Sequence, residues 1–156
     1  MTQQTYAEQI DQMKKRLYRI ALLYLGSESM AVDAVDDAVF KGLISLKKLR
    51  KEEYLGTWIT RILMNVCKDE LRRRKRQLDW EALPETAVEE FDALPLKQAL
   101  LRLPEELKAV IILRYFEGLT QEETAQSLDL PRGTVSTRQR KALELLRLEL
   151  SEEVEA

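Results

Sequence analysis

TQEETAQSLDLPRGTV, residues 120–135, decides how the last third of this chain folds. Thr120 followed three residues later by Glu123 is a capping-box pattern, which predicts the start of a helix. Ala125 is small enough for a close helix crossing, and Asp129-Leu130-Pro131 favours a turn. A second helix then begins near Arg132. The stretch therefore predicts a helix-turn-helix motif.

The helix after this turn has one apolar and one basic face. Val135, Ala142, Leu146 and Leu150 share the apolar face. In helix-turn-helix proteins the opposite face enters the major groove, where cations and hydroxyls bind phosphates and read guanine. An ordinary helical hairpin with a basic exposed face is the alternative. The candidate DNA contacts are Arg132, Thr134, Ser136, Thr137, Arg138, Arg140 and Lys141.

Helical spacing extends upstream of the motif. Leucines at 96, 100 and 103 precede Pro104, which is expected at the first position of a further helix ending at Gly118. At the other end of the chain, Thr5 to Glu8 forms another capping-box pattern and predicts a helix that ends at Gly26.

A second helix is expected after Ser27 and Ser29. Its predicted buried face contains Val32, Val35, Val39, Leu43 and Leu46, and its predicted outward face carries Asp33, Asp36, Asp37 and Lys41.

The third helix is predicted over about 54–76 and has two stripes. Leu55, Ile59, Ile62 and Val66 predict a buried face. A polar stripe repeats the same spacing. A solvated surface is its ordinary explanation, but an amide among cations also suits a helix lying on nucleic acid. The stripe contains Arg61, Asn65, Lys68 and Arg72.

Charge changes sign abruptly after this helix. Residues 61–76 are strongly basic, whereas residues 77–95 contain Asp and Glu but no Lys or Arg. We interpret the acidic segment as a linker. The whole chain has 27 acidic and 25 basic residues and a net charge of −2, which is unusual for a protein that binds DNA by itself.

Composition limits the remaining possibilities. Abundant Leu, Ala, Glu, Lys and Arg with only five Gly and four Pro predict an all-α protein. The absence of His and the single Cys67 disfavour His-based catalysis and a Cys/His metal site, so we expect no catalytic residue, metal or other cofactor. No secretory leader or 18-residue apolar span is evident, and a cytoplasmic location is expected.

Two segments resemble a known family in order and spacing. TWITRILMNVCKDELRRRKR, residues 57–76, resembles the W-L-x-R-I-A-x-N-x-x-x-D-x-L-R-R-x-x-R segment of the extracytoplasmic-function (ECF) group of bacterial RNA polymerase sigma factors. Leu103-Pro104, Glu117-Gly118-Leu119-Thr120 and Pro131-Arg132-Gly133-Thr134-Val135 resemble that group's second domain.

The resemblance implies two small helical domains. A three-helix sigma region 2 over 1–76 would recognise and melt the −10 element through Arg61, Asn65, Lys68 and Arg72, with a flipped base held by a loop at about 50–57. The acidic linker would span 77–95. A sigma region 4 over 96–156 would read the −35 element through its second motif helix.

The resemblance also implies partners. Core RNA polymerase would bind the acidic face with Asp33, Asp36 and Asp37, and an anti-sigma factor, often membrane-anchored in this family, would hold the protein inactive. Promoter DNA would be bound only together with polymerase, and no small-molecule substrate is expected. The alternatives are an autonomous helix-turn-helix regulator and an enzyme or plain interaction protein.

Overall fold

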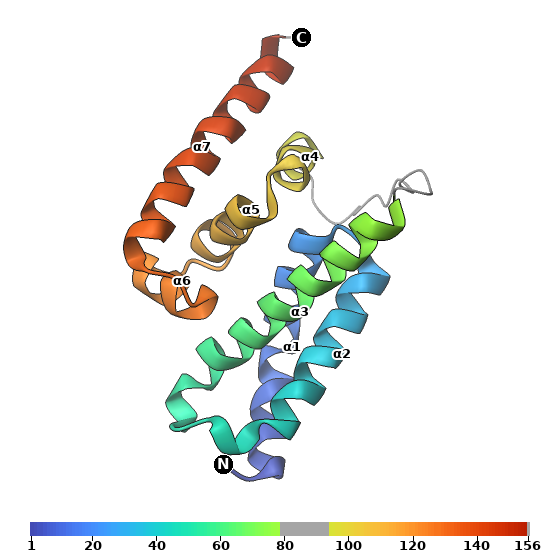
Figure 1. The fold of residues 1–156 in the computed structure, drawn as a ribbon, viewed down its shortest axis with the longest axis vertical. Helices are drawn as coiled ribbons and strands as arrows, with labels where there is room; N and C mark the ends of the chain where they lie inside the picture. Colours follow the sequence, from blue (N-terminus) through green and yellow to red (C-terminus); the bar gives the residue numbers. More distant parts are fainter. Residues whose placement is uncertain (79–93, 156) are drawn as a thin grey trace.

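The computed structural model describes residues 1–78 and 94–155, with side chains placed over 1–74, at 96 and over 98–147. Helices and no strands occur in these ranges, so the all-α prediction is confirmed (Figure 1). Most of the predicted acidic linker lies outside the described residues. The elements are α1 (Gln3–Leu25), α2 (Glu28–Ile44), η1 (Leu46–Lys48), η2 (Glu52–Tyr54), α3 (Leu55–Leu78), α4 (Leu94–Arg102), α5 (Glu105–Ile111), η3 (Ile112–Phe116), α6 (Gln121–Leu128) and α7 (Arg132–Glu155).

Helix α1 begins earlier than predicted. Its N-cap is Thr2, whose Oγ1 accepts a hydrogen bond from the Thr5 amide at 3.1 Å, so Thr5 lies inside the helix. Thr2 satisfies the helix N-terminus one turn upstream, which is why the predicted box at Thr5 is wrong. The predicted end is confirmed, because Gly26 has a φ of 73° and donates to the Leu22 carbonyl.

Helix α2 buries a face that matches the predicted one only in part, with Val35 buried as predicted. Its buried positions are mainly small, including Ala34, Ala38 and Gly42, while Val32 and Leu43 are 47% and 37% exposed. The prediction of a Val/Leu stripe is therefore wrong at these two positions. Small side chains let α2 approach α1 and α3 closely. At this contact, the space between the helices determines which residues are buried more than their hydrophobicity does.

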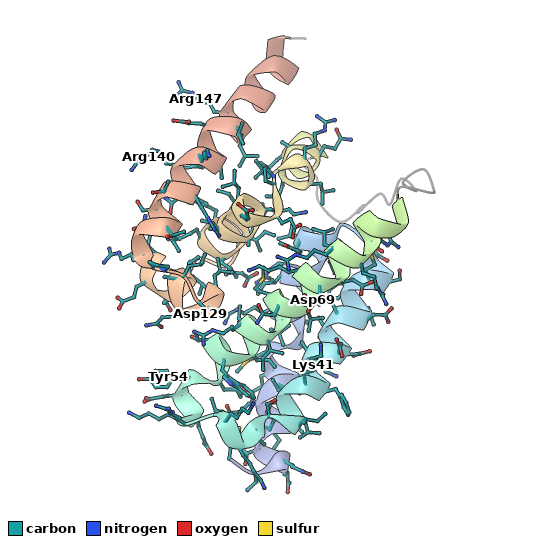
Figure 2. The ribbon with its side chains drawn as sticks, viewed as in Figure 1. Lys41, Tyr54, Asp69, Asp129, Arg140 and Arg147 are labelled. Carbon is teal, nitrogen blue, oxygen red and sulfur yellow. The ribbon has the colours of Figure 1, made fainter. Side chains whose placement is uncertain are left out.

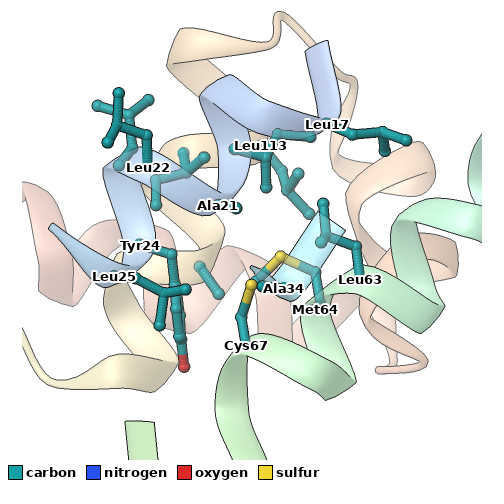
Figure 3. Packing of buried hydrophobic residues seen from close by; sticks show 14 of the residues in the cluster. Leu17, Ala21, Leu22, Tyr24, Leu25, Ala34, Leu63, Met64, Cys67 and Leu113 are labelled. Carbon is teal, nitrogen blue, oxygen red and sulfur yellow. The ribbon is translucent and has the colours of Figure 1, made fainter. Parts of the chain in front are cut away.

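Helix α3 forms the centre of the first bundle. Leu55, Ile59 and Val66 are buried as predicted, but Ile62 is only partly buried, and Leu63, outside the predicted face, is fully buried. Cys67 is buried beside Met64 and near Tyr24 of α1 (Figure 3). This burial, more than the nearby Glu70, raises the pKa of the Cys67 thiol to about 12.

The second half contains the predicted motif. Thr120 Oγ1 accepts from the Glu123 amide, and the Glu123 carboxylate accepts from the Thr120 amide, both at 3.0 Å, which confirms the capping box. Asp129 adopts a left-handed conformation with a φ of 55° at the turn, and α7 follows from Arg132. Pro104 precedes α5 as its N-cap, one residue before the expected position.

The two halves pack against each other. Helix α3 runs beside α6, and α1 contacts α4, α5 and η3 (Figure 1). Leu113 of η3 lies near Leu17 and Ala21 of α1 (Figure 3). The Leu101 side chain of α4 lies so close to Gly26 that a Cβ there would meet it at 3.0 Å. One apolar cluster therefore extends through both halves.

Candidate nucleic-acid interface

A depression of about 370 Å³ lies at the start of α3. The short helices η1 and η2 turn the chain so that cations before α3 lie near aromatic side chains at its start. Aromatic rings stack on bases and cations hold phosphates, so this lining suits an unstacked nucleotide. The lining residues are Lys48, Leu49, Arg50, Tyr54, Thr57, Trp58, Arg61 and Gln126.

Tyr54 and Trp58 are the aromatic residues that line this depression. The Tyr54 side chain is 53% exposed (Figure 2), and the Lys51 Nζ lies 5.8 Å from its ring centroid. Trp58, which precedes the buried Ile59, is partly exposed and lines the depression. Sequence reasoning did not assign Trp58 a site role, although an aromatic residue one turn before Arg61 could have indicated one.

Arg61 and Asn65 lie in different surroundings despite their helical spacing. The Arg61 guanidinium donates through Nε and Nη2 to the main-chain carbonyl of Gln126 in α6. Asn65 is exposed and lines another depression, of about 300 Å³, beside Lys41 and Asp69 (Figure 2). The structure therefore does not bring Arg61 and Asn65 into one depression.

Lys68 and Arg72 complete the predicted α3 stripe. Lys68 is partly buried, and Arg72 is exposed. The pKa of the Lys68 ammonium is lowered, first by burial and then by the positive charges of Arg138 and Arg72. Lys68 thus lies within electrostatic range of α7, the helix that carries the second set of candidate contacts.

The candidate contacts on α7 differ in exposure. Arg132, Thr137, Arg140 and Lys141 are exposed, with Arg140 on the outer side of α7 (Figure 2). The Thr137 hydroxyl donates to the Gly133 carbonyl at 3.0 Å. Thr134, Ser136 and Arg138 are partly buried, and Thr134 and Arg138 line a depression of about 380 Å³ with Glu106 of α5.

Gln139 holds α7 in place. Its Oε1 accepts from Arg114 Nε at 3.0 Å, and its Nε2 donates to the Tyr115 hydroxyl at 3.0 Å. Arg114 also donates to the Leu119 carbonyl before α6. These bonds tie η3 and the α6 entry to α7, a positioning role that helical spacing cannot indicate because the partners are 24 and 25 residues away.

The acidic face of α2 is accompanied by apolar side chains. Asp33, Asp36 and Asp37 are exposed, and Lys41 Nζ lies 3.2 Å from Asp37 Oδ2. Phe40 and Ile44 on the same helix are 60% and 67% exposed. Sequence reasoning missed this apolar component, because it assigned Phe40 and Ile44 to neither face of the helix.

The described residues also form a depression of about 650 Å³ between α1 and α2. They contain no cluster of three acidic or Cys side chains that could hold a metal ion. Among the helices within these ranges, none is long and apolar enough to cross a membrane.

Two family models match the chain in the order of the two halves. The model "Sigma-70 region 2" matches residues 9–77, and "Sigma-70, region 4" matches residues 99–148. RNA polymerase sigma factor SigV of Bacillus subtilis strain 168 is 34% identical, with 90% of this chain and 87% of SigV covered. The fold and sequence thus define a sigma factor with regions 2 and 4.

Similarity to another relative identifies the group more narrowly. ECF RNA polymerase sigma factor SigW of the same Bacillus strain is 28% identical, with 95% of this chain and 90% of SigW covered. The chain belongs to the ECF group of the sigma-70 family, as its sequence predicts.

Solved structures share the fold at lower identity. The sigma factor RpoE, in its complex with the anti-sigma factor NepR from Bartonella quintana, superposes with a TM-score of 0.78 at 21% identity, covering 94% of this chain and 97% of RpoE. CnrH, in complex with the cytosolic domain of CnrY, gives 0.73 at 19% identity, covering 97% and 90%.

Proposed function

We propose that the chain is a promoter-specificity subunit that binds core RNA polymerase, recognises −35 and −10 elements and assists DNA melting. Family membership supports the class of function. The observation that carries the proposal is the depression at the start of α3, which combines Arg50, Tyr54, Trp58 and Arg61. A flipped base costs a few kcal/mol of lost stacking, so a site that holds it favours strand opening.

The −10 surface is assigned to α3 and the turns before it. Arg61, Lys68 and Arg72 supply positive charge for phosphates, and exposed Asn65 supplies an amide that can read a base edge. Tyr54 and Trp58 are added to this surface as stacking platforms.

The −35 surface is assigned to the first turns of α7. Exposed Arg132, Arg140 and Lys141 suit phosphate or guanine contacts in the major groove. The remaining candidate contacts are Thr134, Ser136, Thr137 and Arg138. The Thr137 hydroxyl also donates a hydrogen bond to the Gly133 carbonyl of its own helix.

Polymerase is proposed to bind the exposed face of α2. Asp33, Asp36 and Asp37 give this face negative charge, and Phe40 and Ile44 give it apolar area to bury. Mixed charged and apolar surfaces of this kind suit protein partners, because charge guides the encounter and apolar burial supplies affinity.

The remaining assignments follow from the same role. The chain would act in the cytoplasm, where it would contribute no catalytic group to the polymerase reaction. An anti-sigma factor is a proposed partner, supported by the two solved complexes with 0.78 and 0.73 TM-scores. The proposed domains are region 2 over 1–76, the linker over 77–95 and region 4 over 96–156. The family matches at 9–77 and 99–148 support these two regions.

Run-off transcription on a genomic library, with core polymerase and with or without the chain, tests the function and reports the promoter sequence. We expect discrete chain-dependent start sites that share −35 and −10 sequences. A gel shift on one such promoter should need core polymerase. Tight specific binding by the chain alone would instead favour an autonomous regulator, and the absence of chain-dependent transcripts would contradict the proposal.

A further inference from the structure

A chain of hydrogen bonds runs from Arg114 through Gln139 of α7 to Tyr115. Arg114 Nε donates to Gln139 Oε1 at 3.0 Å, and Gln139 Nε2 donates to the Tyr115 hydroxyl oxygen at 3.0 Å. Gln121, the first residue of α6, adds a further donor, because its Nε2 lies 3.3 Å from the same Gln139 oxygen. Side chains of η3, α6 and α7 therefore meet at one amide.

The first member of this chain fixes its direction. An arginine donates hydrogen bonds and cannot accept them, so the Gln139 amide must turn its oxygen toward Arg114. The amide nitrogen then faces Tyr115, whose phenolic oxygen has to accept. The hydroxyl proton of Tyr115 is thereby directed away from Gln139 and is available to another acceptor. No such acceptor occurs within the ranges of the chain that the structure describes.

The available proton of Tyr115 favours an anion. The Tyr115 side chain is 50% exposed, so a ligand can reach the hydroxyl. Hydrogen bonds arranged head to tail polarise one another, and this chain begins at a cation. The Arg114 guanidinium carbon also lies 5.5 Å from the Tyr115 ring centroid. Both effects make the hydroxyl a better donor to a negatively charged group.

The backbone of η3 brings both ends of this hydrogen-bond chain to Gln139. The Glu117 amide donates to the Ile112 carbonyl, five residues earlier, at 3.0 Å, which is the bond of a π-helical turn. A π turn is wider than an α turn, so consecutive side chains diverge less. Arg114 and Tyr115 are consecutive, and both reach the same amide. Such turns frequently occur at functional sites.

Tyr115 lies beside both helices of the helix-turn-helix motif. In such motifs the second helix enters the major groove and the first helix crosses the DNA backbone. Gln139 precedes exposed Arg140 of α7 (Figure 2), and Gln121 begins α6. Tyrosine hydroxyls are among the groups that bind phosphate oxygens in protein–DNA complexes. The anion nearest to Tyr115 in a DNA complex would therefore be a backbone phosphate.

We propose that Tyr115 donates its hydroxyl proton to a backbone phosphate beside the −35 element, as a DNA contact additional to those on α7. This contact rests on the proposed function, because the bound duplex supplies the phosphate. Arg114 and Gln139 are positioning residues, since their bonds set the direction of the hydroxyl proton. A phosphate carries no base identity, so the contact adds affinity without sequence preference.

Tyr115→Phe removes the hydroxyl and keeps the ring. The measurement is the affinity of the full chain, together with core polymerase, for a promoter duplex that this holoenzyme selects from a random pool. We expect an affinity about 5- to 10-fold lower, as for other hydrogen bonds to charged groups. The salt dependence should keep its slope, because a neutral phenol displaces no counterion. Lys141→Ala should instead reduce that slope by about one. Exposed Gln12→Ala on α1 is the control and should change neither quantity.

Neutral methylphosphonates, substituted one at a time along the same duplex, locate the phosphate. At one position the wild-type chain should lose affinity while Tyr115→Phe loses none beyond the loss it already shows. Gln139→Met keeps the side-chain length but removes both amide bonds, and on this background Tyr115→Phe should cost less than about twofold. Circular dichroism checks that every variant folds.

Three results would overturn the Tyr115 contact: unchanged affinity of Tyr115→Phe, an altered salt slope, or equal responses of both chains at every methylphosphonate. Selection from the same pool by the chain alone tests the proposed function separately. A duplex bound tightly without polymerase would overturn that function, and Tyr115→Phe would then be compared on that duplex. A pool from which neither the holoenzyme nor the chain alone selects a duplex would overturn both.

Discussion

The Tyr6 hydroxyl of α1 lies against Gly42 of α2, at the place where a Cβ on that glycine would stand. The hydroxyl donates to the Val39 carbonyl at 2.7 Å, and the ring is buried, which raises the pKa of Tyr6 to about 12. The Ile59 side chain of α3 also comes within 3.0 Å of the same point. Gly42 is therefore a position where α1, α2 and α3 meet closely.

Replacing Gly42 with alanine should destabilise the first bundle. The methyl group would displace the Tyr6 hydroxyl or Ile59, and overpacking of this kind typically costs about 1–3 kcal/mol. Chemical denaturation monitored by circular dichroism measures the change in the free energy of unfolding.

Gly133→Ala on α7 is the matched control, because no atom lies within 4 Å of its added methyl group. Gly133→Ala should leave the free energy of unfolding unchanged or raise it by up to about 1 kcal/mol, because alanine lowers the conformational entropy of the unfolded chain. Equal stability changes for the two variants would contradict the packing argument.

The capping box predicts a pH-dependent contribution to stability. Hydrogen bonding to the Thr120 amide lowers the pKa of Glu123 below its ordinary 4.5. A lowered folded-state pKa stabilises the protein above the unfolded pKa, and the contribution disappears as pH falls through the folded value. Glu123→Gln should therefore lower the melting temperature slightly at about pH 7, and the difference should shrink as the pH falls through the lowered pKa of Glu123. A difference that persists in acid would count against this account.

Asn65→Ala should slow promoter opening about tenfold, since a base-edge contact contributes about 1–3 kcal/mol. Asn65 is exposed, so helicity and binding to core polymerase should not change. Fluorescence of a base analogue in the −10 element measures opening, and Gln12→Ala on α1 is the surface control. Loss of folding in Asn65→Ala would show that the residue is structural.

Lys141→Ala should weaken use of the −35 element by about tenfold at low salt, because one phosphate or guanine contact is removed from the exposed face of α7. Transcription from promoters with and without an intact −35 element measures the effect. Arg147→Ala, further along α7 (Figure 2), should have a smaller effect. An unchanged response to −35 variants would argue against placing Lys141 on DNA.

Local signals predicted much of this fold. The Thr120 capping box, the Gly26 helix end and the Asp129 turn depend on bonds between residues a few positions apart, so short stretches of sequence specify them. The buried face of α2 was predicted less well. A branched-residue pattern pointed to Val32 and Leu43, whereas the packing of α2 against Tyr6 and Ile59 required small residues.

The candidate nucleic-acid interface was likewise predicted only in part. Spacing along the helices identified Arg61, Lys68 and the basic face of α7 as candidate DNA contacts. It could not show that Arg61 bonds to Gln126, 65 residues away, or that Glu117 meets Arg19 across 98 residues. The sequence by itself determined the helices, the Thr120 capping box, the Gly26 helix end, the turn and the membership of the sigma family, because these reside in local bonds and ordered motifs. Only the tertiary structure decided which helix faces meet. These contacts join residues far apart in the chain, and they depend on complementary shape and charge that no local sequence pattern reveals.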